Sequence, residues 1–151
     1  MFTHYVAGFA FSKDASKVVL IRKNRPKWQA GLLNAVGGHV EEGETPLWAM
    51  GREYQEETGV CNALEDWTLF ATLEGGTKEE GYMVNFYYST EPSHLIVNTM
   101  TDEKVDVYYK GCWDTDEMMH NLPWLIEAAR DCILNPKQKV FLKVDQWSMP
   151  S

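Results

Sequence analysis

Residues 38–60 read GHVEEGETPLWAMGREYQEETGV, a stretch that predicts a glycine turn followed by a helix. Thr45 can cap this helix, and Pro46 suits its first position, where no amide hydrogen is needed. Gly59 suits the left-handed conformation that commonly ends a helix. These local signals predict a helix that begins after Thr45 and ends before Gly59.

Three carboxylates share one face of this predicted helix. Glu53, Glu56 and Glu57 stand at positions i, i+3 and i+4, which lie above one another on a helix. Such carboxylates repel one another unless a cation lies among them, and hard divalent ions, above all Mg2+, are the natural occupants. Nearly the opposite side carries a stripe suited to packing on a sheet, formed by Leu47, Gly51, Tyr54 and Thr58.

An acidic helix face can also be simply solvated, because an exposed like-charge pair costs only about 0.2–0.5 kcal/mol. A solvated face usually interleaves lysines with its glutamates. Between Glu41 and Thr77, however, nine acids accompany a single base, Arg52. This uncompensated charge favours metal binding.

The spacing of the whole stretch resembles the Nudix box, Gly-x5-Glu-x7-Arg-Glu-U-x-Glu-Glu-x-Gly-U, where U is a bulky aliphatic residue. The positions that match are Gly38, Glu44, Arg52, Glu53, Glu56, Glu57, Gly59 and Val60. The one departure is Tyr54, which is aromatic where the family prefers isoleucine, leucine or valine. Since Tyr54 lies on the packing stripe, we expect a repacked core and no lost chemistry.

Length and composition predict one domain over residues 1–151. A chain of 151 residues that is 44% hydrophobic can bury one core. It contains no run of eighteen apolar residues and no signal peptide, so we expect no contact with a membrane. The odd number of cysteines, without a C-x-x-C pair, indicates reduced thiols in the cytoplasm. A net charge of −8 argues against binding long nucleic acids, and the chain is expected to be a monomer or a homodimer.

Periodicity and turn residues predict a mixture of strands and helices. Strands are expected at 2–11, 17–22, 33–41, 67–74, 82–90, 104–109 and 140–144. A second helix is expected over 122–134, because Pro123 lies near its start and Pro136 follows its end. These elements fit the α/β/α sandwich, with a mixed sheet between helices, that the resemblance implies.

The resemblance implies hydrolysis of a diphosphate linkage in a nucleoside diphosphate derivative, with metal ions neutralising the developing charge. It assigns metal ligation to Glu53, Glu56 and Glu57, with a backbone carbonyl near Gly38. The expected ion is Mg2+, with Mn2+ as the alternative. Arg52 lies four residues before Glu56, so it can hold the carboxylates in position.

The general base remains open between Glu53 and a carboxylate outside the box. The best external candidate is Glu103, because relatives often carry a Thr-Asp-Glu run just before a strand. Asp102 is the second, and the hairpin acids Glu79 and Glu80 are the third. For each external acid, the default interpretation is a solvated loop residue.

Candidates for substrate binding lie in the first forty residues, where six bases accompany one acid. Arg25 and Lys27, beside Trp28, could grip a polyphosphate, or they could form a solvated hairpin end. Asn34 matches an asparagine that relatives acting on purine nucleotides use near the base. Trp28 could stack on a base or pack in the core, and the same two interpretations apply to Phe86, Trp113 and Trp124.

Three functional hypotheses follow. The first is a metal-dependent nucleoside triphosphate pyrophosphohydrolase, which would release a monophosphate and pyrophosphate. The second is a Nudix hydrolase of ADP-ribose, a nucleotide sugar or a dinucleoside polyphosphate. The third is a Nudix-fold nucleotide sensor that binds its ligand without hydrolysing it. The intact box residues Arg52, Glu53, Glu56 and Glu57 argue against this third hypothesis. The small domain and Asn34 favour the triphosphates.

Overall fold

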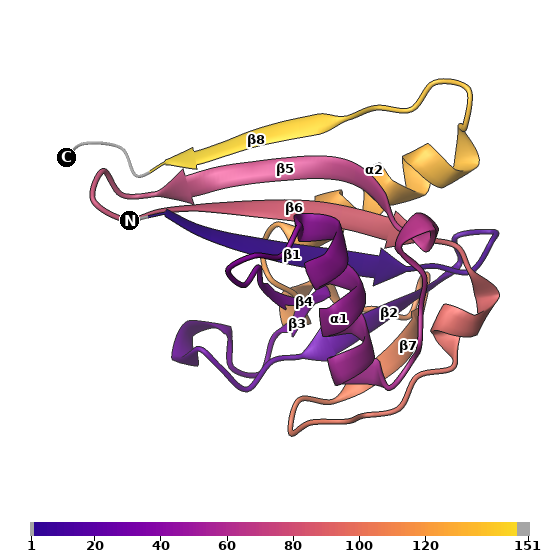
Figure 1. Ribbon diagram of the computed structural model, residues 1–151. Helices are drawn as coiled ribbons and strands as arrows, with labels where there is room; N and C mark the ends of the chain where they lie inside the picture. The colour runs from indigo at the N-terminus through magenta and orange to yellow at the C-terminus, as the bar shows by residue number, and fades with distance from the viewer. Residues whose placement is uncertain (1, 148–151) are drawn as a thin grey trace.

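Two sheets and two helices make up the computed structural model, which describes residues 2–147 (Figure 1). The strands are β1 (Phe2–Ala10), β2 (Lys17–Arg22), β3 (Leu33–Asn34), β4 (Val36–His39), β5 (Thr68–Gly76), β6 (Gly81–Ser89), β7 (Val105–Tyr109) and β8 (Leu142–Trp147). The helices are α1 (Pro46–Thr58) and α2 (Leu122–Leu134), and short 3-10 turns are η1 (Lys27–Gln29), η2 (Leu64–Asp66), η3 (Pro92–Leu95) and η4 (Thr115–Glu117). Among the described residues, no helix is both long enough and apolar enough to span a membrane.

The larger sheet has the strand order β4-β1-β6-β5-β8 and is mixed. Strands β1 and β6 run parallel, as do β5 and β8, whereas β1–β4 and β5–β6 are antiparallel. The smaller sheet, β3-β2-β7, is antiparallel throughout. The predicted mixed α/β architecture is therefore confirmed.

Two predicted strands differ in their bounds. The stretch predicted over 33–41 divides at Ala35, because β3 pairs with β2 while β4 pairs with β1 in the other sheet. The closing strand, predicted over 140–144, begins instead at Leu142 and continues to Trp147 alongside β5.

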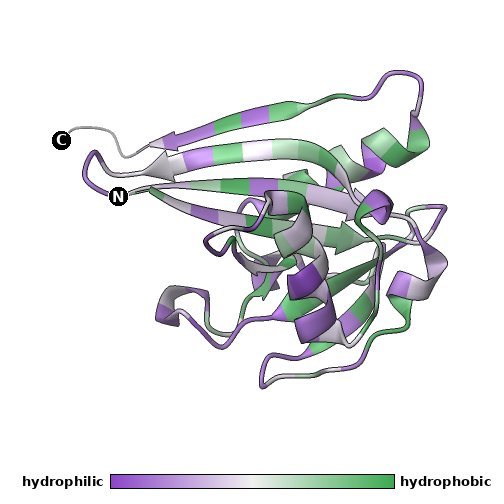
Figure 2. Ribbon diagram, in the orientation of Figure 1, coloured by the Kyte–Doolittle hydropathy of each residue, from purple (hydrophilic) through white to green (hydrophobic). Residues whose placement is uncertain are grey.

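The two helices cover opposite faces of the larger sheet. On β1, Val6 and Ala10 belong to a buried cluster that includes α1 residues, while Ala7 and Phe9 belong to a second cluster that includes α2 residues. Figure 1 shows α1 in front of the sheet and α2 behind it. Figure 2 shows the matching alternation of hydrophobic and hydrophilic residues along the strands, which is the period-2 pattern of a sheet.

Helix α1 begins and ends where the sequence predicts. The Thr45 side chain accepts a hydrogen bond from the Trp48 backbone N–H at 3.2 Å, and Pro46 is the first helical residue. Gly59 has φ 77° and donates its N–H to the Gln55 carbonyl, so a residue with a side chain would be strained there.

The Tyr54 side chain is fully buried on the face of α1 that packs against the core. Its hydroxyl donates to the His94 carbonyl at 2.6 Å, and its ring meets Trp67 edge-on at 5.0 Å. The aromatic departure from the box pattern is thus absorbed by packing. The predicted packing stripe holds at Tyr54 and Thr58, while Leu47 and Gly51 are only half-buried because Ala49 and Met50 take the central positions.

Candidate active site

The acidic face of α1 lies against the glycine segment of β4. A Cβ atom at position 38 would collide with the carboxylate of Glu53, so glycine leaves room for that side chain in its present orientation. The Glu53 side chain is consequently 12% exposed. Gly38 and Glu53, fifteen positions apart in the sequence, form one side of the site.

Arg52 organises the acids around it. Its Nε and Nη2 donate to the two oxygens of Glu44 at 2.6 and 2.9 Å, a bidentate pair. Its Nη1 donates to Glu53 at 3.0 Å and to Glu56 at 3.2 Å, and Nη2 also donates to the His39 carbonyl at 2.9 Å. One guanidinium therefore joins the loop before α1, the end of β4 and two of the three helix carboxylates.

The same contacts shift the pKa values of Arg52 and Glu44 in opposite directions. The hydrogen bonds that Arg52 donates to Glu44 raise the pKa of Arg52 above its ordinary value. The hydrogen bonds from Arg52, together with the Glu41 backbone N–H, lower the pKa of Glu44. The Arg52 guanidinium and the Glu44 carboxylate are thus both held in the charged forms that an ion pair requires.

Glu57 lies where the loop before β7 crosses the end of α1. Its Oε2 accepts a hydrogen bond from the Thr101 hydroxyl at 3.1 Å. Burial raises the pKa of Glu57, the Thr101 hydrogen bond opposes the shift, and the nearby negative charge of Glu103 adds to it. The loop thus brings a fourth acid close to the helix carboxylates.

Glu103 is buried, which excludes the interpretation as a solvated loop acid. Its Oε1 accepts from Lys23 Nζ at 2.9 Å, and its Oε2 accepts from the backbone N–H groups of Asn24 and Arg25 at 2.6 and 3.3 Å. Burial alone would raise the pKa of Glu103, but these backbone donors and the Lys23 ammonium hold it below its ordinary value. Glu103 therefore fastens the loop after β2 to the loop before β7.

Glu53 differs from Glu103 in its electrostatic surroundings. Burial raises the pKa of Glu53 to about 7, the hydrogen bond and charge of Arg52 oppose the shift, and the charges of Glu56 and Glu57 add to it. A carboxyl whose pKa lies near neutrality can exchange a proton at physiological pH.

This pKa shift predicts how a Glu53→Gln variant changes the stability of the metal-free protein. A carboxyl whose pKa is raised on folding contributes stability below its unfolded pKa near 4.5, and this contribution is lost as the pH rises through about 7. Glu53→Gln should therefore stabilise the protein at pH 8 by on the order of 1–2 kcal/mol, and by much less at pH 5.

The measurement is thermal unfolding in chelator at both pH values, with the exposed Glu65→Gln as the matched control. A stabilisation of equal size at pH 5 and pH 8, or a loss of stability at pH 8, would contradict the assignment.

The donor set suits a hard divalent cation, although the carboxylates do not converge in this arrangement. Among residues 2–147, no three His, Cys, Asp or Glu side chains form a group that could hold a metal ion. Arg52 draws Glu53 and Glu56 onto its guanidinium, and Glu57 bonds to Thr101 instead. Glu56 is 55% exposed, so its side chain has room to rotate when it leaves Arg52.

The predicted phosphate-binding residues lie in the loop between β2 and β3. Arg25 forms a bidentate pair with Asp102 at 3.0 and 2.7 Å. Asp102, the second external candidate for the general base, is therefore occupied by an ion pair with Arg25. Lys27 and Trp28 begin η1 and are exposed, with Trp28 at 68%. Lys27 and Trp28 are therefore available to a ligand, whereas Arg25 is engaged with Asp102.

Asn34 lies on β3, at the base of the same loop. Its side-chain Nδ2 donates to Gln29 Oε1 at 3.1 Å, and its Oδ1 accepts from the Ala35 backbone N–H at 2.8 Å. Gln29 belongs to η1, so Asn34 is linked to the segment that carries Lys27 and Trp28.

The remaining candidates for base stacking and for the general base lie in different parts of the fold. Phe86 lies in the core, Trp113 packs partly buried against it, and Trp124 is 39% exposed on α2. The hairpin turn that carries Glu79 and Glu80 lies at the end of β5 and β6, away from the C-terminal half of α1 (Figure 1).

Sequence reasoning did not single out several residues that shape the site. Lys23, Gln29 and Thr101 each hydrogen-bond to a candidate residue, yet their partners lie between 5 and 80 positions away. Glu44 had a signal in the box spacing, and the structure shows it as the bidentate partner of Arg52.

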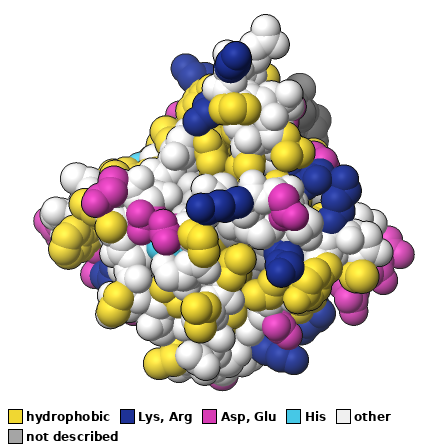
Figure 3. Space-filling view, turned by 90° about the vertical axis from the view of Figure 1, so that its right-hand side faces the viewer, with side chains coloured by type: hydrophobic (Ala, Val, Ile, Leu, Met, Phe, Trp, Pro, Cys, Tyr) yellow, Lys and Arg dark blue, Asp and Glu magenta, His cyan; other side chains and the backbone are white. Residues whose placement is uncertain are grey.

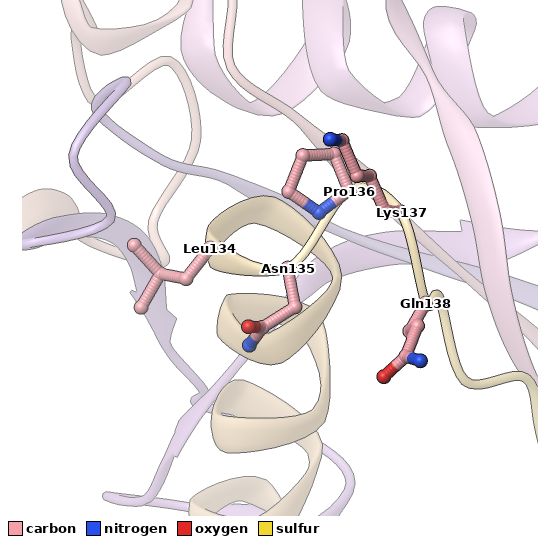
Figure 4. Close-up of a pocket in the computed structure, with 5 residues that line it drawn as sticks. All are labelled: Leu134, Asn135, Pro136, Lys137 and Gln138. Atoms are coloured by element: carbon pink, nitrogen blue, oxygen red, sulfur yellow. The ribbon is translucent and has the colours of Figure 1, made fainter.

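Two shallow hollows are lined without Glu53, Glu56 or Glu57. One, of about 290 Å³, is lined by Gly43, Glu44, Thr45 and Trp48 at the start of α1. The other, of about 400 Å³, is lined by the consecutive residues 134–138 after α2, whose side chains point in different directions (Figure 4). The second hollow contains no acid, histidine or cysteine, so it offers no group for hydrolysis.

One face of the molecule shows basic, acidic and hydrophobic side chains interspersed (Figure 3). The described residues form no continuous basic strip on this face, which is the feature that binds nucleic acid through its phosphates.

Comparison with known proteins yields one family. The chain matches the NUDIX domain over residues 2–143. No curated protein matches it. A solved MutT protein from Bacillus halodurans is 18% identical, with a TM-score of 0.63 over 98% of this chain and 91% of that one.

Two further solved structures share the fold. A MutT Nudix hydrolase from Burkholderia pseudomallei is 16% identical, with a TM-score of 0.68 over 84% of this chain and 97% of that one. A bifunctional NMN adenylyltransferase/ADP ribose pyrophosphatase from Francisella tularensis, complexed with AMP and a Mn ion, is 18% identical, with a TM-score of 0.64 over 88% and 42% of the two chains. At these identities the likeness concerns the fold.

Proposed function

Because this chain belongs to the Nudix family and is a Nudix pyrophosphohydrolase, we propose that its substrates are nucleoside triphosphates. The reaction is hydrolysis of one phosphoric anhydride bond, in which a triphosphate and water give a monophosphate and pyrophosphate. The observation that carries the hydrolytic part of the proposal is the guanidinium of Arg52, which holds Glu44, Glu53 and Glu56 together beside Gly38.

Glu53, Glu56 and Glu57, with the backbone near Gly38, are the residues that would hold Mg2+ or Mn2+. Their oxygens are the hard ligands that these ions prefer, and the three side chains share one face of α1. A bound divalent ion would neutralise charge on the phosphate oxygens. Through the hydrogen bonds described above, Arg52 holds the Glu53 and Glu56 carboxylates beside each other on this face.

We assign the proton-accepting role to Glu53 and a positioning role to Glu103. Glu103 already accepts three hydrogen bonds, and its lowered pKa makes it a weak base. The pKa of Glu53 is about 7 in the metal-free protein, and a bound divalent cation would lower it, so the Glu53 carboxylate would be ionised and able to accept a proton. Glu103 instead keeps the two loops together beside Glu57.

The exposed segment Lys27–Gln29 supports a nucleotide as the ligand. Lys27 presents an ammonium that suits phosphate oxygens, and Trp28 presents an exposed ring that suits a base. Asn34 is bonded to Gln29 below them and offers an amide that could read the edge of a base.

The experiment that tests the substrate class is a hydrolysis screen with identified products. Nucleoside triphosphates should give monophosphate and pyrophosphate with a higher kcat/KM than ADP-ribose, a nucleotide sugar or a dinucleoside polyphosphate. A higher kcat/KM for any of these three would replace the triphosphate proposal with that class.

Variants of Lys27 and Asn34 should change the kinetics of hydrolysis in different ways. Lys27→Ala should raise KM for all triphosphates alike and spare kcat, because phosphate contacts carry no information on the base. Asn34→Ala should change the ranking among bases, because a site that hydrogen-bonds a base loses discrimination without that partner. Kinetics on several triphosphates measure both effects.

The exposed Lys13→Ala serves as the matched control for Lys27→Ala, since it removes the same charge from the first strand–turn–strand unit. An unchanged base preference in Asn34→Ala would remove the support for base recognition by this residue and leave the metal chemistry untouched.

A further inference from the structure

Strand β8 forms an open edge of the larger sheet. It pairs on one side with β5, in an unbroken register from Ala71↔Leu142 to Gly76↔Trp147. Figure 1 shows it at the outer margin, with no described segment beyond it. Soluble proteins usually protect such edges by shortness, a bulge, proline, charged side chains or a covering segment. Strand β8 carries one charge of each sign, Lys143 and Asp145. The six residues of β8 contain no proline or glycine, and their register with β5 has no bulge.

The side chains of β8 alternate between two faces. Leu142, Val144 and Gln146 are half-buried on one face, where the first two pack against the core. On the other face Lys143, Asp145 and Trp147 are exposed. Phe141, which precedes the strand, continues this alternation and is 46% exposed. Helix α1 covers this face only near β4 and β1, so it stays open over β8.

The two charges on the open face have no partner within residues 2–147. Neither the Lys143 side chain nor the Asp145 side chain takes part in a hydrogen bond or an ion pair there, and Asp145 lies in register with Glu74 of β5. Like charges on directly opposed strand residues destabilise a sheet. Asp145 therefore lacks a cation that would offset Glu74.

We propose that β8 of a second copy of this chain pairs antiparallel with this edge, around a two-fold axis at Val144, and makes one continuous sheet across the dimer. In this register Lys143 lies opposite Asp145 of the partner subunit, and Asp145 lies opposite the partner's Lys143. Phe141 lies opposite the partner's Trp147, so the exposed rings meet at both ends.

The charges select this register over its neighbours. Centring the axis on Lys143 or Asp145 would place two like charges directly opposite each other, which is unfavourable. The same operation on β7, the edge strand of the smaller sheet, would place Asp106 opposite Tyr108 of the partner subunit, so no opposite charges would meet. The edge at β8 is thus self-complementary, and the edge at β7 is not.

The proposed interface lies away from the acidic face. Helix α1 packs on β4 and β1, near the opposite edge of the larger sheet from β8. Strands β6 and β5 lie between β1 and β8. Both active sites of the dimer therefore stay open, and hydrolysis does not depend on association.

The test is analytical ultracentrifugation of the full chain over a concentration series. The wild-type protein should associate to a dimer. Lys143→Asp and Asp145→Lys each turn two attractive pairs into repulsive ones, so each should weaken the dimer at least tenfold. The double variant Lys143→Asp/Asp145→Lys restores both pairs and should dimerise like the wild type, as should an equimolar mixture of the two single variants.

Glu65→Lys is the matched charge reversal outside the edge and should leave the dimer intact. Circular dichroism and the rate of hydrolysis report that each variant is folded. A wild-type protein that stays monomeric at hundreds of micromolar, single variants that dimerise like the wild type, or a mixture of them that fails to associate would each overturn the proposal.

Discussion

Replacing Glu57 with glutamine is expected to lower kcat on the order of 100- to 1,000-fold while leaving the fold intact. Glutamine keeps the size of the side chain and can still accept the hydrogen bond from Thr101. It loses the negative charge that a divalent cation requires, and the same reasoning applies to Glu56. The measurement is kcat for a nucleoside triphosphate at saturating Mg2+.

The exposed Glu42→Gln is the control, because it removes one charge from the same acidic stretch outside the helix. Its kcat should match the wild type. If Glu57→Gln and Glu56→Gln both turned over at the wild-type rate, the metal assignment to α1 would be wrong.

Arg52→Lys is expected to lower kcat about 10- to 100-fold although it keeps the positive charge. The guanidinium donates at once to Glu44, Glu53, Glu56 and the His39 carbonyl, and no single ammonium can reproduce this fork. The carboxylates would lose their fixed positions, so the Mg2+ concentration needed for half-maximal rate should rise as well. Kinetics at several Mg2+ concentrations measure both quantities.

The split between kcat and KM separates positioning from substrate contact. A positioning role lowers kcat with little change in KM for the nucleotide, whereas loss of a phosphate contact raises KM. Arg22→Lys, in β2, is the matched control and should retain both values. An Arg52→Lys enzyme with wild-type kcat and an unchanged Mg2+ requirement would refute the positioning role.

The sequence predicts α1 to the residue because its signals are local. Thr45, Pro46 and Gly59 each act on the backbone within one turn of the helix, so no distant contact is needed to place its ends. The three glutamates share a face for the same reason, since the period of the helix fixes their relation.

Features that depend on distant pairing could not be predicted in this way. The division of 33–41 at Ala35 arises because neighbouring residues pair with strands of two different sheets. The start of β8 at Leu142 depends on where β5 offers a partner, 71 positions earlier. Propensity gives no information on such partners.

The site shows the same limit. The residues around Glu103 in the sequence do not predict its burial, which arises because Lys23 and the Asn24 backbone reach it from about 80 positions away. Arg25 carries a charge suited to phosphate, but Asp102 takes it as a partner. Charge predicts what a residue can bind, and only the fold decides which partner is near.

The most direct test of the metal-dependent mechanism is hydrolysis of a nucleoside triphosphate in chelator, followed by addition of excess Mg2+. We expect the rate to fall to background in chelator and to recover with Mg2+ in the wild-type protein, and not to recover in a Glu56→Gln/Glu57→Gln variant. Hydrolysis that continues unchanged in chelator would contradict the account.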